Sequence, residues 1–411
     1  MQLSDWLQRI GQIHPREIEL GLQRIAAVVS RMQLNRFSCP VITIAGTNGK
    51  GSTVGFLEHL YCRAGYRVGS YTSPHLLRFN ERIKLKAKPV DDDLLCDAFT
   101  EIEAQRGTTS LTYFEYTTLA ALYIFQQSQL DVIILEVGLG GRLDAVNIID
   151  PSVAVITAID LDHQRILGND REAIGREKAG IFRSHGLAVC GDLDPPQSIL
   201  THASELKVQL SCVGEAFQYR VNNSGWEWQN YQRHLNLPFA RLPIQNIATS
   251  LQVIDLLQTL LPVKENLIPP AVAEAHVAGR LQKLPGHSQR WVDVAHNPQS
   301  TRYLADWLRQ QSVTGRVFSV WSMLADKDLQ ASLAPLVELV DRWFIGPLDV
   351  ERAATAKQLQ AAAEITGLAN YSIENSVEQA YQRAIEQQES GDWLIVFGSF
   401  HTVAKVLGSA L

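Results

Sequence analysis

The stretch VITIAGTNGKGST, residues 41–53, decides the fold. It predicts a buried, β-branched strand over residues 41–45, a glycine-rich turn, and a helix over residues 52–64. A strand that passes through a tight turn into a helix is the repeating unit of parallel α/β sheets. The stretch therefore predicts an α/β fold in which ligands bind at the carboxyl ends of the strands.

The turn within this stretch has the features of a phosphate-binding loop. Gly46, Gly49 and Gly51 allow backbone N–H groups to approach an anion, and the following helix N-terminus adds a partial positive charge. Lys50 supplies a full charge for the outer phosphates. The spacing differs from the usual GxxxxGK[ST], because two residues separate Gly46 from Gly49 and a glycine follows the lysine. The alternative is a purely structural turn, but the lysine followed by the hydroxyl of Ser52 favours phosphate binding.

Outward from this stretch, short β-branched runs alternate with longer helical patterns, as in a mostly parallel sheet covered by helices. Further strands are predicted over residues 131–137, 152–157, 316–321 and 393–397. Further helices are predicted over residues 114–127, 170–181, 245–261 and 301–310. Between residues 206 and 239, short strand-like pieces with turn residues predict a small antiparallel excursion.

A change of composition marks a domain boundary. The segment GRLQKLPGHSQR, residues 279–290, is rich in Gly, Pro and polar residues, and a new strand, loop and helix begin at Trp291. We therefore predict one domain over residues 1–284, which carries the phosphate loop, and a smaller, Rossmann-like domain over residues 285–411. The polar segment is the predicted hinge.

Composition limits the classes of partner. The chain has 411 residues, of which 46% are hydrophobic and 19% charged, and its net charge is −6. A weakly acidic chain has no overall attraction to nucleic acid or to an anionic membrane, so we expect small-molecule substrates and neither of those partners. The five cysteines are scattered and form no CxxC pair, which is typical of reduced thiols in a cytoplasm. The N-terminal residues carry charges too early for a signal peptide, so we expect a cytoplasmic protein. We also expect a monomer.

A carboxylate follows the apolar run of the strand predicted over residues 131–137. In DVIILEVGLGGRLDAVN the run ends at Glu136, at the sheet edge where ligands bind. A buried carboxylate needs a partner, and Mg²⁺ is suited to it. The alternative is an ordinary salt bridge, which is less favoured beside a phosphate loop.

Two further residues, His163 and Lys178, become candidates for the site only when they are considered together with the phosphate loop and Glu136. His163 follows a strand in the segment ITAIDLDHQRILG, where a single histidine is more often a capping or surface residue. Lys178 lies near the end of a short predicted helix, where a solvated lysine is the default.

Together the motifs resemble the folylpolyglutamate synthase and dihydrofolate synthase family of the Mur ligases. The matching strings are AGTNGKGST, SYTSPHLLRFNERI, FEYTTLAAL, LEVGLGGRLDAVN, LDH, REKAGIF, PIQNIATSL, DVAHNP and VFGSFHTVAKV. They run in the expected order from residue 45 to residue 406. TSPHL with RFNERI, and GLGGRLDAVN, are specific to the folate branch.

The resemblance implies a role for each matching position. ATP would be bound by Thr47, Asn48, Gly49, Lys50, Gly51, Ser52, Asn246, Arg280 and Asp293. Mg²⁺, with two sites expected and K⁺ as an additional candidate, would be bound by Ser73, Glu136, His163 and Lys178. The pterin substrate would be received by Leu20, Gly21, Leu22, Phe114, Glu115, Tyr116, Thr117, Arg142, Leu143 and Asp144.

For three residues the resemblance implies further chemistry. Lys178 matches a lysine carried as an N6-carbamate, which turns a cation into a carboxylate-like metal ligand. His296 is our candidate base for the incoming glutamate amine, and Ser399 matches a position that faces this glutamate. One departure is visible, because His163 is followed by QRILG where relatives often carry Thr-Asp-Trp before Leu-Gly.

The reaction implied is an ATP-dependent ligation through an acyl phosphate. The substrate carboxylate attacks the γ-phosphate of MgATP, and the glutamate amine then displaces phosphate. The alternatives are a folylpolyglutamate synthase alone, a Mur-type ligase acting on a cell-wall precursor, or a switch protein that hydrolyses ATP only to change shape.

Overall fold

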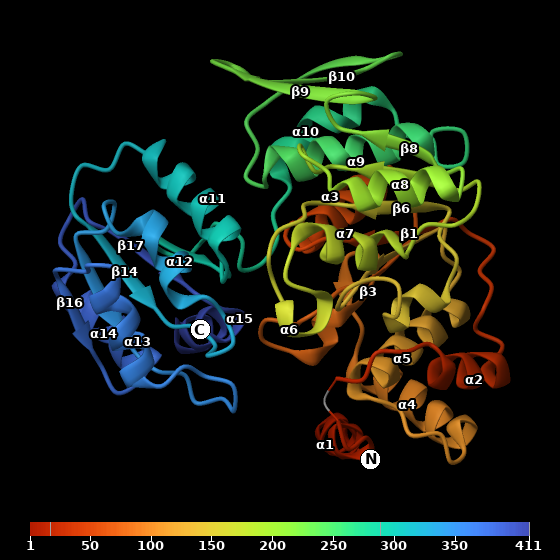
Figure 1. The fold of residues 1–411 in the computed structure, drawn as a ribbon, viewed down its shortest axis with the longest axis horizontal. Helices are drawn as coiled ribbons and strands as arrows, with labels where there is room; N and C mark the ends of the chain where they lie inside the picture. The colour runs from red at the N-terminus through yellow and green to blue at the C-terminus, as the bar shows by residue number, and fades with distance from the viewer. Residues whose placement is uncertain (17, 288, 411) are drawn as a thin grey trace. The chain divides into compact units, whose positions relative to one another are not determined.

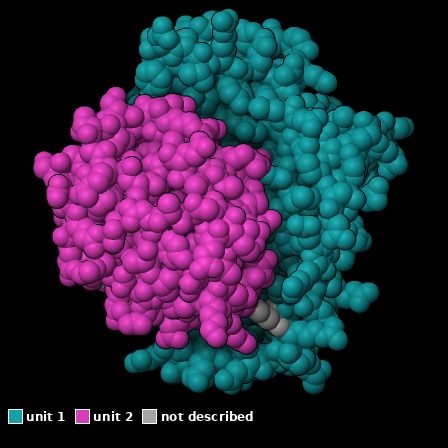
Figure 2. Space-filling view, turned by 60° about the vertical axis from the view of Figure 1, so that its left-hand side comes forward, with its two compact units in different colours: residues 1–276 teal, residues 277–411 magenta. Residues whose placement is uncertain are grey.

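The structure, a computed structural model, describes residues 1–16, 18–287 and 289–410. The chain separates into two compact units, Met1–His276 and Val277–Leu411, which Figure 2 shows in different colours. The boundary predicted from composition, after residue 284, falls within the second unit. Ser288 of the predicted hinge lies outside the described residues. Within the described ranges of both units, no helix is both long and apolar enough to span a membrane.

The first unit is built on an eight-stranded sheet in the order β4-β3-β2-β5-β1-β6-β7-β8. Strand β1 (Val41–Ala45) is wholly buried and pairs in parallel with β5 (Val132–Glu136) and β6 (Val153–Ile156). The other strands are β2 (Val68–Tyr71), β3 (Ile83–Leu85), β4 (Lys88–Pro89), β7 (Leu187–Cys190) and β8 (Gln209–Cys212). The sheet is parallel except at the β2-β3-β4 edge, which is antiparallel. The predicted parallel sheet is therefore confirmed.

Helices of the first unit lie around this sheet, and Figure 1 shows α1, α2, α4 and α5 gathered below it. They are α1 (Leu3–Ile13), α2 (Gln23–Met32), α3 (Lys50–Arg63), α4 (Asp92–Arg106), α5 (Tyr113–Gln127), α6 (Gln164–Leu167), α7 (Arg171–Ala179), α8 (Gln197–Glu205), α9 (Ile244–Leu256) and α10 (Ile268–Glu274). Short 3-10 turns are η1 (Phe79–Arg82), η2 (Ala145–Ile148) and η3 (Glu265–Leu267).

Several predicted helix ends were wrong, among them the end of α9 at Leu256 rather than residue 261 and the start of α11 at Pro298 rather than residue 301. Two of the helix starts have a clear cause. Helix α3 begins at Lys50 rather than at residue 52, because Gly49 takes a left-handed backbone (φ 90°) that closes the turn early. Helix α7 begins one residue after Asp170, whose side chain caps it by accepting a hydrogen bond from the Ala173 N–H.

The predicted antiparallel excursion is confirmed for three strands and wrong for one. Strands β9 (Phe217–Asn222), β10 (Gly225–Asn230) and β11 (His234–Leu237) form a separate antiparallel sheet. Strand β8 instead extends the main sheet, in parallel with β7. A short strand carries no local signal of which sheet it joins.

The second unit has a six-stranded sheet in the order β12-β13-β17-β14-β15-β16. Its strands are β12 (Gln282–Lys283), β13 (Arg290–Asp293), β14 (Val317–Trp321), β15 (Arg342–Ile345), β16 (Tyr371–Ile373) and β17 (Trp393–Phe397). Its helices are α11 (Pro298–Arg309), α12 (Leu329–Leu333), α13 (Ala356–Ile365), α14 (Val377–Gln387) and α15 (Phe400–Ala410), with the 3-10 turn η4 (Ala334–Leu336). All pairs but β12-β13 are parallel, as in a Rossmann-like unit.

Candidate active site

The phosphate loop joins β1 to α3, and its glycines are required where they stand. A Cβ on Gly46 would lie 1.8 Å from the Thr157 Oγ1 atom, and one on Gly49 would lie 2.4 Å from the Asn246 Oδ1 atom. The second contact places Asn246, on α9, beside the turn. Two residues predicted to bind nucleotide, nearly two hundred positions apart in the chain, thus lie next to each other.

Two lysines of the predicted site converge on this loop. The Lys50 and Lys178 ammonium groups both donate to the carbonyl oxygen of Gly46, each at 2.9 Å. Lys178 lies on α7 and is only 4% exposed. Burial, and then the nearby Lys50 charge, lower the pKa of Lys178 to about 7. A lysine that is partly neutral near physiological pH is a competent nucleophile toward carbon dioxide.

Two of the residues predicted to bind a metal, Glu136 and Ser73, lie beside the same turn. Glu136, at the end of β5, is 5% exposed, and its Oε2 atom accepts a hydrogen bond from the Ser73 N–H at 3.3 Å. The Oε2 atom also lies 3.9 Å from where a Cβ on Gly51 would stand. Glu136 and Ser73 thus lie together at the phosphate loop.

Within the described ranges, no three His, Cys, Asp or Glu side chains are arranged to hold a metal. The predicted set contains only two residues of these types, Glu136 and His163, because its other two members are a serine and a lysine. Oxygen donors from Ser73 and Glu136, completed by phosphate oxygens, fit a hard cation such as Mg²⁺. His163 would add a nitrogen ligand, and Lys178 only if it were carbamylated.

The N-terminal segment and the loop after β5 form the predicted substrate region. The Gly21 N–H donates to the Leu143 carbonyl at 3.2 Å, which brings the segment of Leu20 and Leu22 beside the segment of Arg142 to Asp144. Asp144 caps η2 and accepts hydrogen bonds from the Leu139 and Val146 N–H groups. Burial raises the pKa of Asp144 to about 6, although these backbone bonds oppose the shift.

The residues of α5 that were predicted to receive the substrate lie in different surroundings. A Cβ on Gly138 would lie 2.5 Å from the Phe114 ring, so this ring packs against the loop after β5. The Thr117 hydroxyl is bonded to that of Tyr71 at 2.9 Å. Tyr116 is fully buried, and its hydroxyl donates to the Phe99 carbonyl, a core position.

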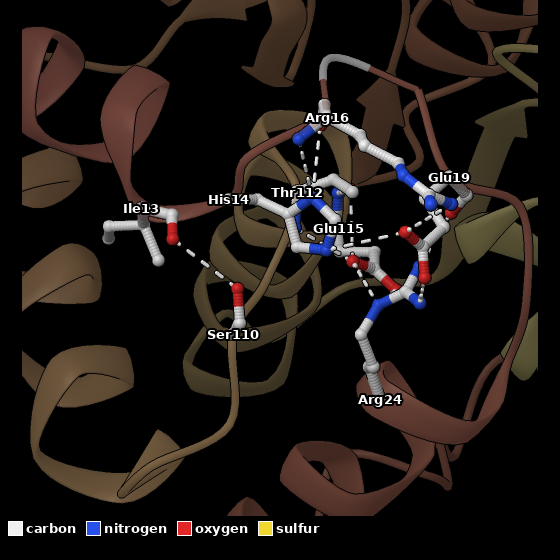
Figure 3. Close-up of polar contacts among 8 residues, drawn as sticks. All are labelled: Ile13, His14, Arg16, Glu19, Arg24, Ser110, Thr112 and Glu115. Carbon is white, nitrogen blue, oxygen red and sulfur yellow. Dashed lines mark hydrogen bonds and ion pairs between the residues drawn. The ribbon is translucent and has the colours of Figure 1, made fainter.

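A polar network, which sequence reasoning missed in part, ties the chain's N-terminal segment to α5 (Figure 3). Glu115 is 3% exposed and forms a capping box with Thr112, whose N–H donates to Glu115 Oε2 at 2.8 Å. The Arg24 Nε atom lies 3.2 Å from Glu115, and its Nη1 atom donates to Glu19 at 2.6 Å. The T-x-x-E pattern could have predicted the capping box. No local pattern pointed to Arg24.

In the second unit, the predicted nucleotide residues Arg280 and Asp293 interact. Asp293 accepts hydrogen bonds from the Leu281 and Ala295 N–H groups, both at 2.8 Å. Burial raises its pKa, and the Arg280 charge opposes this shift. The Arg280 guanidinium carbon lies 5.4 Å from the centre of the Phe400 ring.

The two remaining predicted residues lie close to the same ring. The His296 ring centre is 6.4 Å from that of Phe400, and its Nδ1 atom is 2.8 Å from the Val294 carbonyl oxygen. Ser399, which precedes Phe400, is 4% exposed and accepts a hydrogen bond from the Thr402 N–H. Arg280, Asp293, His296 and Ser399 therefore form one group in this unit.

Comparison with known families assigns both units. Residues 44–254 match the Mur ligase middle domain, and residues 279–400 match the Mur ligase glutamate ligase domain. The first match covers β1 to α9 and includes the phosphate loop. The second includes all four residues of the group in the second unit.

Individual relatives align over nearly the whole chain. The dihydrofolate synthase/folylpolyglutamate synthase of Escherichia coli is 44% identical over 98% of this chain and 94% of its own length. The structure of Escherichia coli FolC in complex with DHPP and ADP superposes with a TM-score of 0.95, at 43% identity, over 100% of this chain and 97% of that one. A bifunctional folylpolyglutamate synthase/dihydrofolate synthase with Mn, AMPPNP and L-glutamate bound gives 0.92, at 44% identity, over 100% and 98%.

Proposed function

The chain belongs to the Mur ligase family and is an ATP-dependent ligase, and on that premise we propose that it joins L-glutamate to dihydropteroate, forming dihydrofolate, and to reduced folates, forming folylpolyglutamates. Relatives named for both activities align along the whole chain, which supports the proposal. One active site would serve both reactions, because each activates a carboxylate and couples it to the same amine.

The convergence of Lys50 and Lys178 on the Gly46 carbonyl is the observation that carries this proposal. The Lys50 ammonium, at a glycine-rich turn before a helix, can neutralise the phosphate charge that would repel an attacking carboxylate. Lys178, close beside it, is the residue proposed to carry the carbamate. No serine, cysteine or threonine nucleophile is required, since the substrate carboxylate itself attacks the γ-phosphate.

The steps follow from the positions of this chain's residues. Lys50 and the backbone N–H groups of residues 47–52 would hold the triphosphate, and Asn246 would contact the nucleotide from α9. Asp144 and Glu115 would orient the substrate through its hydrogen-bond donors. The glutamate amine must be neutral to attack the acyl phosphate, and His296 is the proposed base.

The divalent cation would be held by Ser73, Glu136 and His163. When bound, it screens charge on the phosphates and orients the γ-phosphate for attack. A relative crystallised with Mn and AMPPNP supports a divalent metal in this family. We propose Mg²⁺ at two sites, the second completed by a carbamate on Lys178. K⁺ is a further candidate, which a titration of monovalent cations would test.

We also propose that the protein acts as a cytoplasmic monomer on small molecules. In the structure all five cysteines are free thiols, which suits a reducing compartment. Sedimentation of the purified protein would test the monomer.

An ADP-release assay tests the proposal and its alternatives together. With ATP and glutamate saturating, we expect release to require either dihydropteroate or tetrahydrofolate, and mass spectrometry to show products extended by glutamate. If the protein extended tetrahydrofolate but did not convert dihydropteroate, it would be a folylpolyglutamate synthase only. Release without any glutamate would indicate a nucleotide-driven switch, and release with a cell-wall precursor a Mur-type amino acid ligase.

A further inference from the structure

The segment that carries His163 is bonded to the phosphate loop along one side. The Thr47 N–H donates to the Ala158 carbonyl at 2.7 Å. The Thr47 hydroxyl donates to the Asp160 carbonyl at 3.0 Å and accepts from the Asp160 N–H at 3.1 Å. Because one threonine satisfies both backbone groups of Asp160, this segment and the phosphate loop are fixed to each other.

On the other side, an ion pair holds the neighbouring residue Ile159, which is 2% exposed. The Ile159 N–H donates to Asp192 Oδ2 at 2.6 Å, and its carbonyl accepts from Arg171 Nε at 3.1 Å. Arg171 Nη2 in turn donates to Asp192 Oδ1 at 3.1 Å. The three residues form a closed ring of hydrogen bonds, in which charged partners hold both backbone groups of Ile159.

Arg171 also links this segment to Lys178. It is the first residue of α7, and Lys178 lies near the other end of the same helix. A helix is stiff over this length, so the bond from Arg171 to Ile159 ties the segment that precedes His163 to the helix that carries Lys178. Both are residues proposed to hold the metal.

The backbone of His163 shows why such support is needed. Its φ of 51° lies in the left-handed region, which a residue with a Cβ occupies at a cost of about 1–3 kcal/mol. Strained conformations of this kind persist only where the surrounding structure imposes them. The His163 N–H donates to Asp162 Oδ1 at 2.8 Å, and the bonds to Thr47, Arg171 and Asp192 fix the residues that come just before it in the chain.

We propose that Arg171 and Asp192 are positioning residues that hold His163 in place for the divalent metal. This inference rests on the proposed metal role of His163 and adds residues that touch neither metal nor substrate. Residues that orient a metal ligand typically contribute about 10- to 100-fold to metal affinity.

The chain offers a matched control for a test. Asp194 binds the same arginine at 2.9 Å, but its side chain is 91% exposed and makes no bond to Ile159. We would measure Mn²⁺ binding by electron paramagnetic resonance in the presence of ADP. Asp192→Asn should weaken Mn²⁺ binding about tenfold, whereas Asp194→Asn should leave it unchanged. ADP binding in EDTA should be unchanged in both variants.

Arg171→Lys provides a second, milder variant. Lysine keeps the positive charge but cannot form the forked bonds to Ile159 and Asp192 together, so it should weaken Mn²⁺ binding as Asp192→Asn does. If the Asp192→Asn and Arg171→Lys proteins were folded and bound Mn²⁺ with full affinity, this inference would be overturned and the proposed function would stand. Absence of Mn²⁺ binding by the unaltered protein with ADP would overturn the proposed metal role, and this inference with it.

Discussion

Lys50 and Lys178 donate to one acceptor, the Gly46 carbonyl oxygen, each at 2.9 Å. Two ammonium groups at a single carbonyl repel each other, and this repulsion contributes to the lowered pKa of Lys178. The pair is a poor arrangement for two permanent cations. It would become a favourable one if phosphate approached Lys50 and Lys178 were converted to the proposed carbamate anion.

Removal of the Lys50 ammonium should abolish most of the activity without unfolding the protein. Electrostatic groups that stabilise the transition state commonly contribute about 100- to 1,000-fold, so we expect Lys50→Ala to lower kcat by at least that factor. Steady-state assays of ADP release would measure it. Lys264→Ala, a change at an exposed lysine of the same unit, is the control. Near-normal turnover of Lys50→Ala would refute the phosphate-loop assignment.

Carbamylation of Lys178 should depend on pH. Its folded pKa of about 7 lies below its ordinary value of 10.5, so the amine becomes neutral as pH rises through about 7. Only the neutral amine reacts with carbon dioxide, so the carbamate should be lost as pH falls below 7. In ¹³C-bicarbonate, NMR should show a carbamate resonance in the native protein and none in Lys178→Ala.

A functional counterpart of this prediction uses the same variant. Lys178→Ala should be nearly inactive, and short carboxylic acids should restore part of its activity by filling the vacated position. By linkage, the unmodified amine binds more protons in the unfolded chain between pH 7 and 10.5. Its contribution to the free energy of unfolding should therefore rise with pH across that window. An unmodified, fully active enzyme would contradict the carbamate.

Loss of Arg24 should destabilise the first unit, because it leaves the buried Glu115 carboxylate without its cation. Breaking a fully buried pair costs about 3–5 kcal/mol, and the cost here should be about 2 kcal/mol, since Arg24 is 22% exposed. Urea denaturation of Arg24→Ala would measure it. Arg16→Ala is the matched control, because Arg16 also pairs with Glu19 but is 72% exposed. Equal midpoints for the two variants would show that the buried pair contributes nothing.

Changes at the shared residues should affect both glutamylations together. Lys50→Ala and Glu136→Ala should abolish the conversion of dihydropteroate and the extension of tetrahydrofolate alike. Arg142→Ala could impair one more than the other, because the second substrate is longer by one glutamate and must lie differently. Product chain lengths from mass spectrometry would separate these cases. A Lys50→Ala enzyme that retained one activity would require two separate sites.

The sequence by itself determined the local elements of this protein. Short β-branched apolar runs and the glycine turn predicted β1, β17 and the phosphate loop, because these depend on residues close together in the chain. The match of motifs then indicated the family and the candidate ligands. Helix ends were less certain, since a cap such as Asp170 is decided by one side-chain bond.

Only the tertiary structure decided which distant residues meet. β1 lies between β5 and β6, and this order brings Glu136 and the segment of His163 to the two sides of the phosphate loop. No local pattern encodes strand order, nor the bond from Arg171 to Ile159, nor the burial that lowers the pKa of Lys178. Such contacts arise from packing between segments far apart in sequence, and the chemistry of the site depends on them.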